Sequence, residues 1–248
     1  MSTRSPRIRV RPQLSDEASS YVRGLIMSGE LQPGTSVRPE TIGEALKIST
    51  TPAREALQAL RVEGFLELIP RRGFQVAPLT GQDIRDLFQV QALIAGELAA
   101  RAAAIATEED IAELEALHHE LIAAASRNND EALEEKNHAF HREINLMADS
   151  RKIAWALELV TRYVPRRFYS AIEGWPAATV EDHTKLLEGI RVKDSEGTRA
   201  AMYEHIIHAG ELLAKHFDRR IAASSLEEGA TSGIREDHLP ASDVSRAS

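Results

Sequence analysis

Residues 49–64, STTPAREALQALRVEG, decide the fold of the first part of this 248-residue chain. Ser49 or Thr50 can cap a helix here, Pro52 suits its first turn, and Gly64 ends it. The apolar residues recur at helical spacing and predict one buried face: Ala53, Ala56, Leu57 and Leu60. Three polar residues lie off this face near the start, where a recognition helix carries the side chains that reach base edges: Thr50, Thr51 and Arg54.

Residues 14–77 around this stretch are expected to form one domain. Apolar periodicity predicts helices over 16–28 and from Pro39 to about residue 46. The three residues between the second helix and the third allow only a tight turn, so these two helices must pack at an angle. Residues 65–69 and 73–76 are strand-like, and a basic tip separates them, Pro70-Arg71-Arg72. A helix-turn-helix followed by a hairpin is the winged arrangement.

The rest of the chain predicts an all-α bundle of about six helices over residues 81–222, so the fold class is mainly α. Residues 78–80 are expected to be a hinge. Residues 1–13 predict a flexible basic arm, and residues 223–248, rich in Ser, Gly and acids, predict a disordered tail. Thr80 and Thr107 each precede an Asp by three residues, as in a capping box. The predicted helices are 81–105, 108–127, 130–148, 151–171, 179–193 and 195–222.

Composition narrows the class of protein. The net charge is −8, yet residues 1–78 carry 11 basic and 8 acidic residues, whereas residues 79–248 carry 19 and 30. A mildly basic head on an acidic body suits a local DNA contact with a separate second domain. The absence of cysteine excludes disulfides and thiolate metal sites. We expect no membrane span and no secretory signal, and a cytoplasmic location.

Three later helices carry histidines whose side chains could converge. Asn137 and His141 are four residues apart and share a helix face, while His183 and His205 lie on the last two helices. Neutral imidazole binds divalent Zn, Ni, Co or Mn, and ligands from several helices can meet inside a bundle. Spacing alone leaves open that they are surface or core residues. We expect His118 and Glu134 to be surface residues.

Two further polar residues are candidate effector contacts. Gln91 lies in the middle of the apolar stripe of helix 81–105, where it must either find a partner on a neighbouring helix or dimer seam or contact a ligand. Arg162 and Arg166 share a face of helix 151–171. They could supply positive charge to an acidic effector, or form a solvated face.

Residues 14–77 resemble the GntR family of bacterial transcription regulators. The match runs through Gly29, Pro33-Gly34, Ser49, Thr51-Pro52, Arg54-Glu55-Ala56-Leu57, Glu63-Gly64 and Arg72-Gly73. The helical body looks like the FadR-type effector domain, the branch called FCD. This resemblance implies a DNA-binding regulator, in most cases a repressor, that is a homodimer, binds a near-palindromic double-stranded operator and responds to a small-molecule effector such as an organic acid.

The resemblance also implies site residues. FCD domains typically hold a metal with Asp-x-x-x-His on one helix and one His on each of two later helices, which corresponds here to Asn137, His141, His183 and His205. The metal would be Zn, Ni or Mn, bound more weakly because Asn137 replaces the usual Asp. From their positions in the predicted elements, the candidate DNA contacts are Arg38, Thr50, Thr51, Arg54, Arg71, Arg72 and Gly73, and the candidate effector contacts are Gln91 and Arg162.

In the head, one position departs from the family pattern and others have two possible roles. Thr50 stands where the family usually has Arg, so a bidentate contact to guanine would be missing. Arg54 either reaches DNA or pairs with Glu55 or Gln58 on its own helix. Arg71 and Arg38 could equally be solvated.

Two other functions compete with a metal-dependent regulator. The first is a metal-independent, ligand-responsive regulator in which the histidines line the effector pocket. The second, more remote, is a metalloenzyme in which three histidines activate water. No general base at a metalloprotease spacing and no nucleophile elbow support the enzyme.

Overall fold

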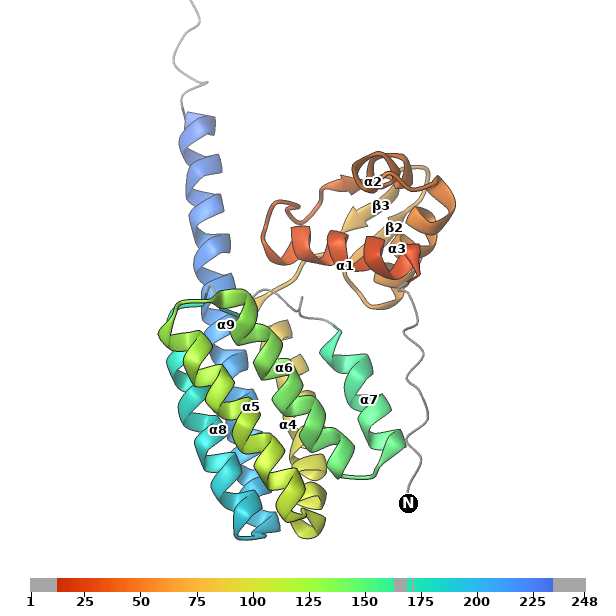
Figure 1. Ribbon diagram of the computed structural model, residues 1–248. Helices are drawn as coiled ribbons and strands as arrows, with labels where there is room; N and C mark the ends of the chain where they lie inside the picture. Colours follow the sequence, from red (N-terminus) through yellow and green to blue (C-terminus); the bar gives the residue numbers. More distant parts are fainter. Residues whose placement is uncertain (1–12, 163–168, 171, 234–248) are drawn as a thin grey trace, which may run out of the picture.

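The computed structural model describes residues 13–162, 169–170 and 172–233, with side chains up to residue 219 (Figure 1). Most of the predicted arm, residues 1–12, lies outside the described residues. So do Arg166 and the last part of the predicted tail, residues 234–248.

The head is a winged helix-turn-helix, as predicted. Its elements are α1 (Leu14–Met27), β1 (Ser36–Val37), α2 (Pro39–Leu46), α3 (Thr50–Val62), β2 (Leu66–Ile69) and β3 (Gly73–Val76). The sheet has the order β1-β3-β2 with antiparallel pairs, and Leu66 faces Val76 in the β2–β3 hairpin. The sequence analysis missed β1, because two residues are too short to display an alternating pattern.

The tight turn between α2 and α3 depends on a left-handed residue and a close backbone approach at a glycine. Lys47 adopts a left-handed conformation with φ 56°, and the Ile48 N–H donates to the carbonyl of Gly43 at 2.9 Å. A Cβ on Gly43 would lie 2.9 Å from the Ile48 carbonyl oxygen, so this close approach requires glycine. Ser49 is the N-cap of α3, although its side chain makes no capping hydrogen bond.

The four apolar residues predicted for the inner face of α3 are all fully buried. They pack against α1, where Ala18 and Val22 are equally inaccessible. Arg23 of α1 is 7% exposed and donates from Nη2 to Glu63 Oε2 at 2.6 Å, and its guanidinium lies 5.6 Å from the centre of the Phe65 ring. The end of α3 is thereby held against α1.

The described part of the body contains six helices, in agreement with the prediction, and both capping boxes form. Three boundaries differ from the expectation. α7 ends at Thr161 instead of near residue 171, and α8 begins at Trp175 because Pro176 suits a first helical turn. α9 continues to Gly233, so the boundary predicted at residue 222 is too early. The helices are α4 (Gly81–Ile105), α5 (Glu108–Ser126), α6 (Asp130–Met147), α7 (Arg151–Thr161), α8 (Trp175–Arg191) and α9 (Ser195–Gly233).

Helices α4 and α9 pack along each other more extensively than any other pair and run through the body (Figure 1). A Cβ on Gly210 would lie 2.6 Å from Phe88 Cβ, so glycine permits this close approach. At the start of α4, the Gly81 N–H donates to Asp218 Oδ1 of α9 at 3.1 Å. Arg85 adds an ion pair to Glu211 at 2.9 Å. The chain therefore enters the body from the head at a point fixed to α9.

None of the helices in the described part of the chain combines the length and apolar composition that a membrane crossing needs.

Candidate metal centre and nucleic-acid interface

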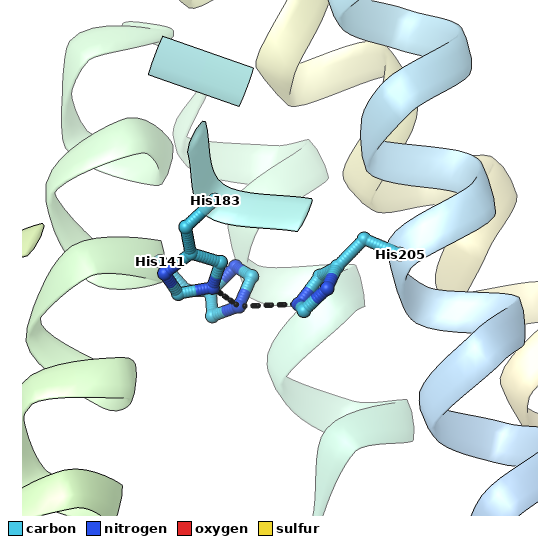
Figure 2. A group of neighbouring side chains, drawn as sticks. All are labelled: His141, His183 and His205. Carbon is cyan, nitrogen blue, oxygen red and sulfur yellow. Dashed lines mark hydrogen bonds between the residues drawn. The ribbon is translucent and has the colours of Figure 1, made fainter. Parts of the chain in front are cut away.

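Three histidines from three helices converge in the body (Figure 2). His141 lies on α6, His183 on α8 and His205 on α9. The Nε2 atom of His141 is 3.1 Å from Nε2 of His205 and 3.3 Å from Nε2 of His183. His183 is 0% exposed and His205 is 4% exposed. The structure thus brings together the three histidines that the sequence analysis singled out.

The spacing and protonation of this group suit a metal ion. Burial is the main cause that holds the pKa of both His141 and His183 well below the usual value, and the positive charge of neighbouring imidazoles adds to it. Neutral imidazoles offer lone pairs to a metal. Two nitrogens bound to one tetrahedral Zn²⁺ lie about 3.3 Å apart, close to the two distances found here.

Asn137 completes the predicted set on the face of α6 that carries His141. It lies one helical turn before that histidine and is 8% exposed. Its Oδ1 atom has no hydrogen-bond partner among the described residues. A buried carbonyl oxygen without a partner is costly, and a bound cation is one ligand that satisfies such an oxygen. The residues present therefore fit a divalent metal, with an amide oxygen in place of a carboxylate.

Aromatic and polar residues enclose the histidines. Phe140 stacks on His183, and His118 of α5 lies 6.0 Å from His183 between ring centres. His118 is buried, which corrects the expectation of a surface residue, and burial lowers its pKa. Its Nε2 is 3.1 Å from Thr184 Oγ1. The signal was present in the sequence, because position 118 lies on the same apolar stripe as Leu114 and Leu121.

The sequence analysis did not single out Asp182, which contacts two histidines of α9. Its Oδ2 atom accepts hydrogen bonds from His205 Nδ1 at 3.3 Å and His208 Nδ1 at 3.4 Å. Burial would raise the pKa of Asp182, but the hydrogen bonds and charge of the two histidines outweigh burial and lower it. No sequence signal distinguishes this carboxylate from a surface charge, since the contact exists only after α8 and α9 have packed.

Glu134 is another buried carboxylate, which corrects the expectation of a surface charge. It is 3% exposed, and its Oε1 accepts hydrogen bonds from the backbone N–H and hydroxyl of Ser170, both at 2.8 Å. Burial raises its pKa despite these bonds. Its position on the α6 face of Asn137 and His141 could have revealed that it points inward.

Of the two predicted effector contacts, one is buried and the other is exposed. Gln91 is buried and donates from Nε2 to the Val160 carbonyl at 3.3 Å, so it bridges α4 and α7. Arg162 is exposed at the end of α7, and its described partner is Glu158 at 3.3 Å. The structure does not bring Arg162 to the histidines, and the effector roles of both residues stay predictions.

The predicted DNA-contacting side chains of α3 lie on its exposed side. Thr50, Thr51 and Arg54 are all exposed. Arg54 has no ion pair or hydrogen bond within the described parts of the chain, so the alternative pairing with Glu55 or Gln58 is absent there. Its guanidinium is available to a ligand.

The wing tip is basic and sharply turned. Arg71 has φ 65° and Gly73 has φ 85°, and both flank Arg72 at the start of β3. All three residues are exposed, as is Arg38 at the N-cap of α2. The contacts of these residues with DNA stay predictions.

Comparison with known proteins supports both halves. The family described as bacterial regulatory proteins, gntR family, matches residues 14–76, and the FCD domain matches residues 86–208. The HTH-type transcriptional repressor RspR of Escherichia coli K12 is 25% identical over 73% of this chain and 80% of its own length. The Glc operon transcriptional activator of the same strain is 28% identical over 61% of this chain and 67% of its own length.

A solved structure shares the fold over most of the chain. The E. coli McbR/YncC structure superposes with a TM-score of 0.65 at 22% identity and covers 84% of this chain and all of its own. The matched family and these relatives are transcription regulators and not enzymes. This chain therefore belongs to the GntR family of bacterial DNA-binding transcriptional regulators, in the group whose effector domain is an FCD domain.

Proposed function

We propose that this regulator is a cytoplasmic homodimeric repressor whose affinity for a near-palindromic operator depends on an organic acid bound at a metal in the FCD domain. The observation that carries the proposal is the convergence of His141, His183 and His205. The unpartnered oxygen of Asn137, one helical turn before His141, adds to it. The histidine centre lies in the FCD domain of a DNA-binding regulator. Because these regulators are not enzymes, we assign the centre to effector sensing and not to catalysis.

The metal would be held by the three Nε2 atoms and the Asn137 amide oxygen. A divalent Zn, Ni or Mn ion held by these residues would supply a concentrated positive charge that attracts an anionic oxygen. A carboxylate is the simplest ligand with that chemistry. Gln91 carries no charge, so the positive ion itself would provide most of the attraction for an acid.

A two-fold dimer follows from the way winged helices read palindromes. An apolar surface on the body supports it. Val90 and Leu93 on α4 are 44% and 60% exposed, and Trp155 and Leu159 on α7 are 57% and 44% exposed. Because α4 and α7 pack together, these exposed side chains lie on two neighbouring helices that a second copy could cover. Sedimentation of a Leu93→Arg variant tests this, and an unchanged dimer would exclude this face.

The metal-independent alternative has its own support, since the imidazoles are close enough to hydrogen-bond to one another at 3.1 and 3.3 Å. Metal analysis of the purified full chain and of His183→Ala separates the two proposals. The metal-dependent function predicts near-stoichiometric metal in the wild type and its loss in the variant. Equal metal content in both proteins would exclude the centre.

Operator binding tests the complete proposal. DNA fragments selected from a random pool by the wild-type protein provide the operator. Titration of that operator with and without chelator, and with small carboxylic acids, should change the affinity only when metal is present. An affinity that neither metal nor acids alter would contradict effector control through this site.

A further inference from the structure

We propose that Asp182 is a positioning residue of the metal centre: it orients His205 for binding and supplies the negative charge that the four inner ligands lack. This inference rests on the metal site of the proposed function. It concerns a residue outside the predicted ligand set, whose carboxylate reaches the centre only through an imidazole.

The first argument is the tautomer of His205. An ionised carboxylate can only accept a hydrogen bond, so the 3.3 Å contact to Asp182 Oδ2 places a hydrogen on His205 Nδ1. In the neutral imidazole the lone pair then lies on Nε2. This is the atom that faces His141 Nε2 at 3.1 Å. The contact with Asp182 therefore prepares His205 to bind a metal through the nitrogen that points into the group.

The second argument is charge. Asn137 and three neutral histidines bring no negative charge to a divalent ion, and the searched part of the chain adds no carboxylate to the histidine group. A buried cation without a counter-charge is costly. The side chain of Asp182 is 15% exposed and contacts His205 directly. Because little water surrounds it, its negative charge interacts more strongly with a cation at the histidine group than an exposed charge would. An outer carboxylate thus replaces the charge that an Asp at position 137 would bring.

The other partners of Asp182 define the controls. His208 donates to the same Oδ2 atom from an imidazole that is 51% exposed, and Lys185 Nζ lies 3.5 Å from Oδ1 with 56% exposure. Both help to hold the carboxylate in place, but neither belongs to the histidine group. Removing His208 should therefore affect the metal far less than removing the charge of Asp182.

The experiment measures the affinity of the full chain for Zn²⁺ and Co²⁺ by competition with a chromophoric chelator. Asp182→Asn keeps the size and an acceptor oxygen but removes the charge, and we expect its Kd for Zn²⁺ to rise about 10–100-fold. Asp182→Ala should weaken binding at least as much. His208→Gln is the matched control and should raise Kd by less than either.

A rescue variant separates positioning from folding. In the Asp182→Asn background, Asn137→Asp puts a carboxylate inside the centre, and we expect it to restore most of the lost affinity. The visible absorption of bound Co²⁺ reports the ligand set, and it should change in Asp182→Ala, which frees the His205 ring. Thermal unfolding of each metal-free variant shows how much of any loss is structural.

The outcomes distinguish this inference from the function beneath it. If Asp182→Asn binds Zn²⁺ as tightly as the wild type, or loses no more affinity than His208→Gln, Asp182 has no positioning role although the centre stands. If the wild type and His183→Ala bind metal equally, the centre itself is wrong and this inference falls with it. Loss in Asp182→Asn with rescue by Asn137→Asp supports the proposal.

Discussion

Phe140 lies flat against the imidazole of His183, with ring centres 4.1 Å apart and planes inclined by 13°. Both side chains are fully buried, and Phe140 follows Asn137 on the helix that also carries His141. The stack fixes the plane of the most deeply buried histidine of the centre. It therefore links the apolar core of the body to the orientation of a ring in the candidate metal centre.

The first prediction concerns this stack. Phe140→Leu removes the ring but keeps an apolar side chain. We expect the free energy of unfolding of the metal-free protein to fall by about 1–3 kcal/mol, since an aromatic pair adds about 0.5–1.5 kcal/mol and the smaller side chain leaves a void. Urea denaturation measures it. Ile144→Val, which removes one methyl group from the same buried side of the helix, is the control, and an equal loss in both variants would deny the stack any special contribution.

The second prediction concerns the exposed guanidinium on α3. Arg54→Ala should weaken binding to a selected operator by about 1–3 kcal/mol, because it removes an exposed guanidinium that we expect to reach base edges. A mobility-shift titration measures the change. Arg61→Ala is the matched control, as Arg61 is an exposed arginine in the last turn of the same helix. Equal affinities for wild type and Arg54→Ala would remove Arg54 from the interface.

The third prediction concerns pH. Burial holds the pKa of His118, His141 and His183 below the usual value near 6.5, which the unfolded chain retains. As pH falls below about 6.5, these histidines become protonated in the unfolded state but stay neutral in the folded state, so the free energy of unfolding decreases. We expect the metal-free protein to be less stable at pH 5 than at pH 7.

A variant tests the share of one histidine in this pH dependence. His118→Asn keeps a polar group opposite Thr184 but cannot titrate. It should flatten the slope of unfolding free energy against pH by up to about 1.4 kcal/mol per pH unit, which corresponds to one proton. Urea denaturation at several pH values gives the slope. A variant with the full wild-type slope would show that His118 is protonated equally in both states.

The fourth prediction concerns the segment before α8. Glu134→Ala removes the acceptor of two hydrogen bonds from Ser170 and should lower stability by about 1–3 kcal/mol, since two partly buried donors lose their partner. Ser170→Ala removes only the hydroxyl bond and should have a smaller effect. Hydrogen exchange at the Ser170 amide should accelerate in Glu134→Ala alone. Equal exchange in both variants would show that Glu134 does not anchor this segment.

Local signals in the sequence were sufficient where the structure depends on neighbours in the chain. Thr80 and Thr107 with their following acids predicted two helix starts, and both capping boxes form. The three converging histidines were also predictable, because a family pattern identified them. The start of α8 was predicted at residue 179 but lies at Trp175, although Pro176 is well suited to a first helical turn.

Side chains whose environment is set by distant segments were not predictable in this way. His118 and Glu134 were predicted to be surface residues because they are polar, although their positions on the helices place them on buried faces. The partners of Asp182 lie on another helix, and nothing within α8 announces them. Gln91 could be placed in a buried stripe, but its bond to Val160 depends on how α7 folds back on α4.

Helix α9 carries His205 at one level and Asp218, which holds the N–H of Gly81, at another. Thirteen residues of unbroken helix separate the two, a span of about 20 Å. A helix is stiff along its axis, so a small displacement imposed at the histidine end arrives nearly undiminished where the head is attached. Under the proposed function, one helix would therefore carry a movement of the histidine centre to the attachment of the head without a relay of side chains.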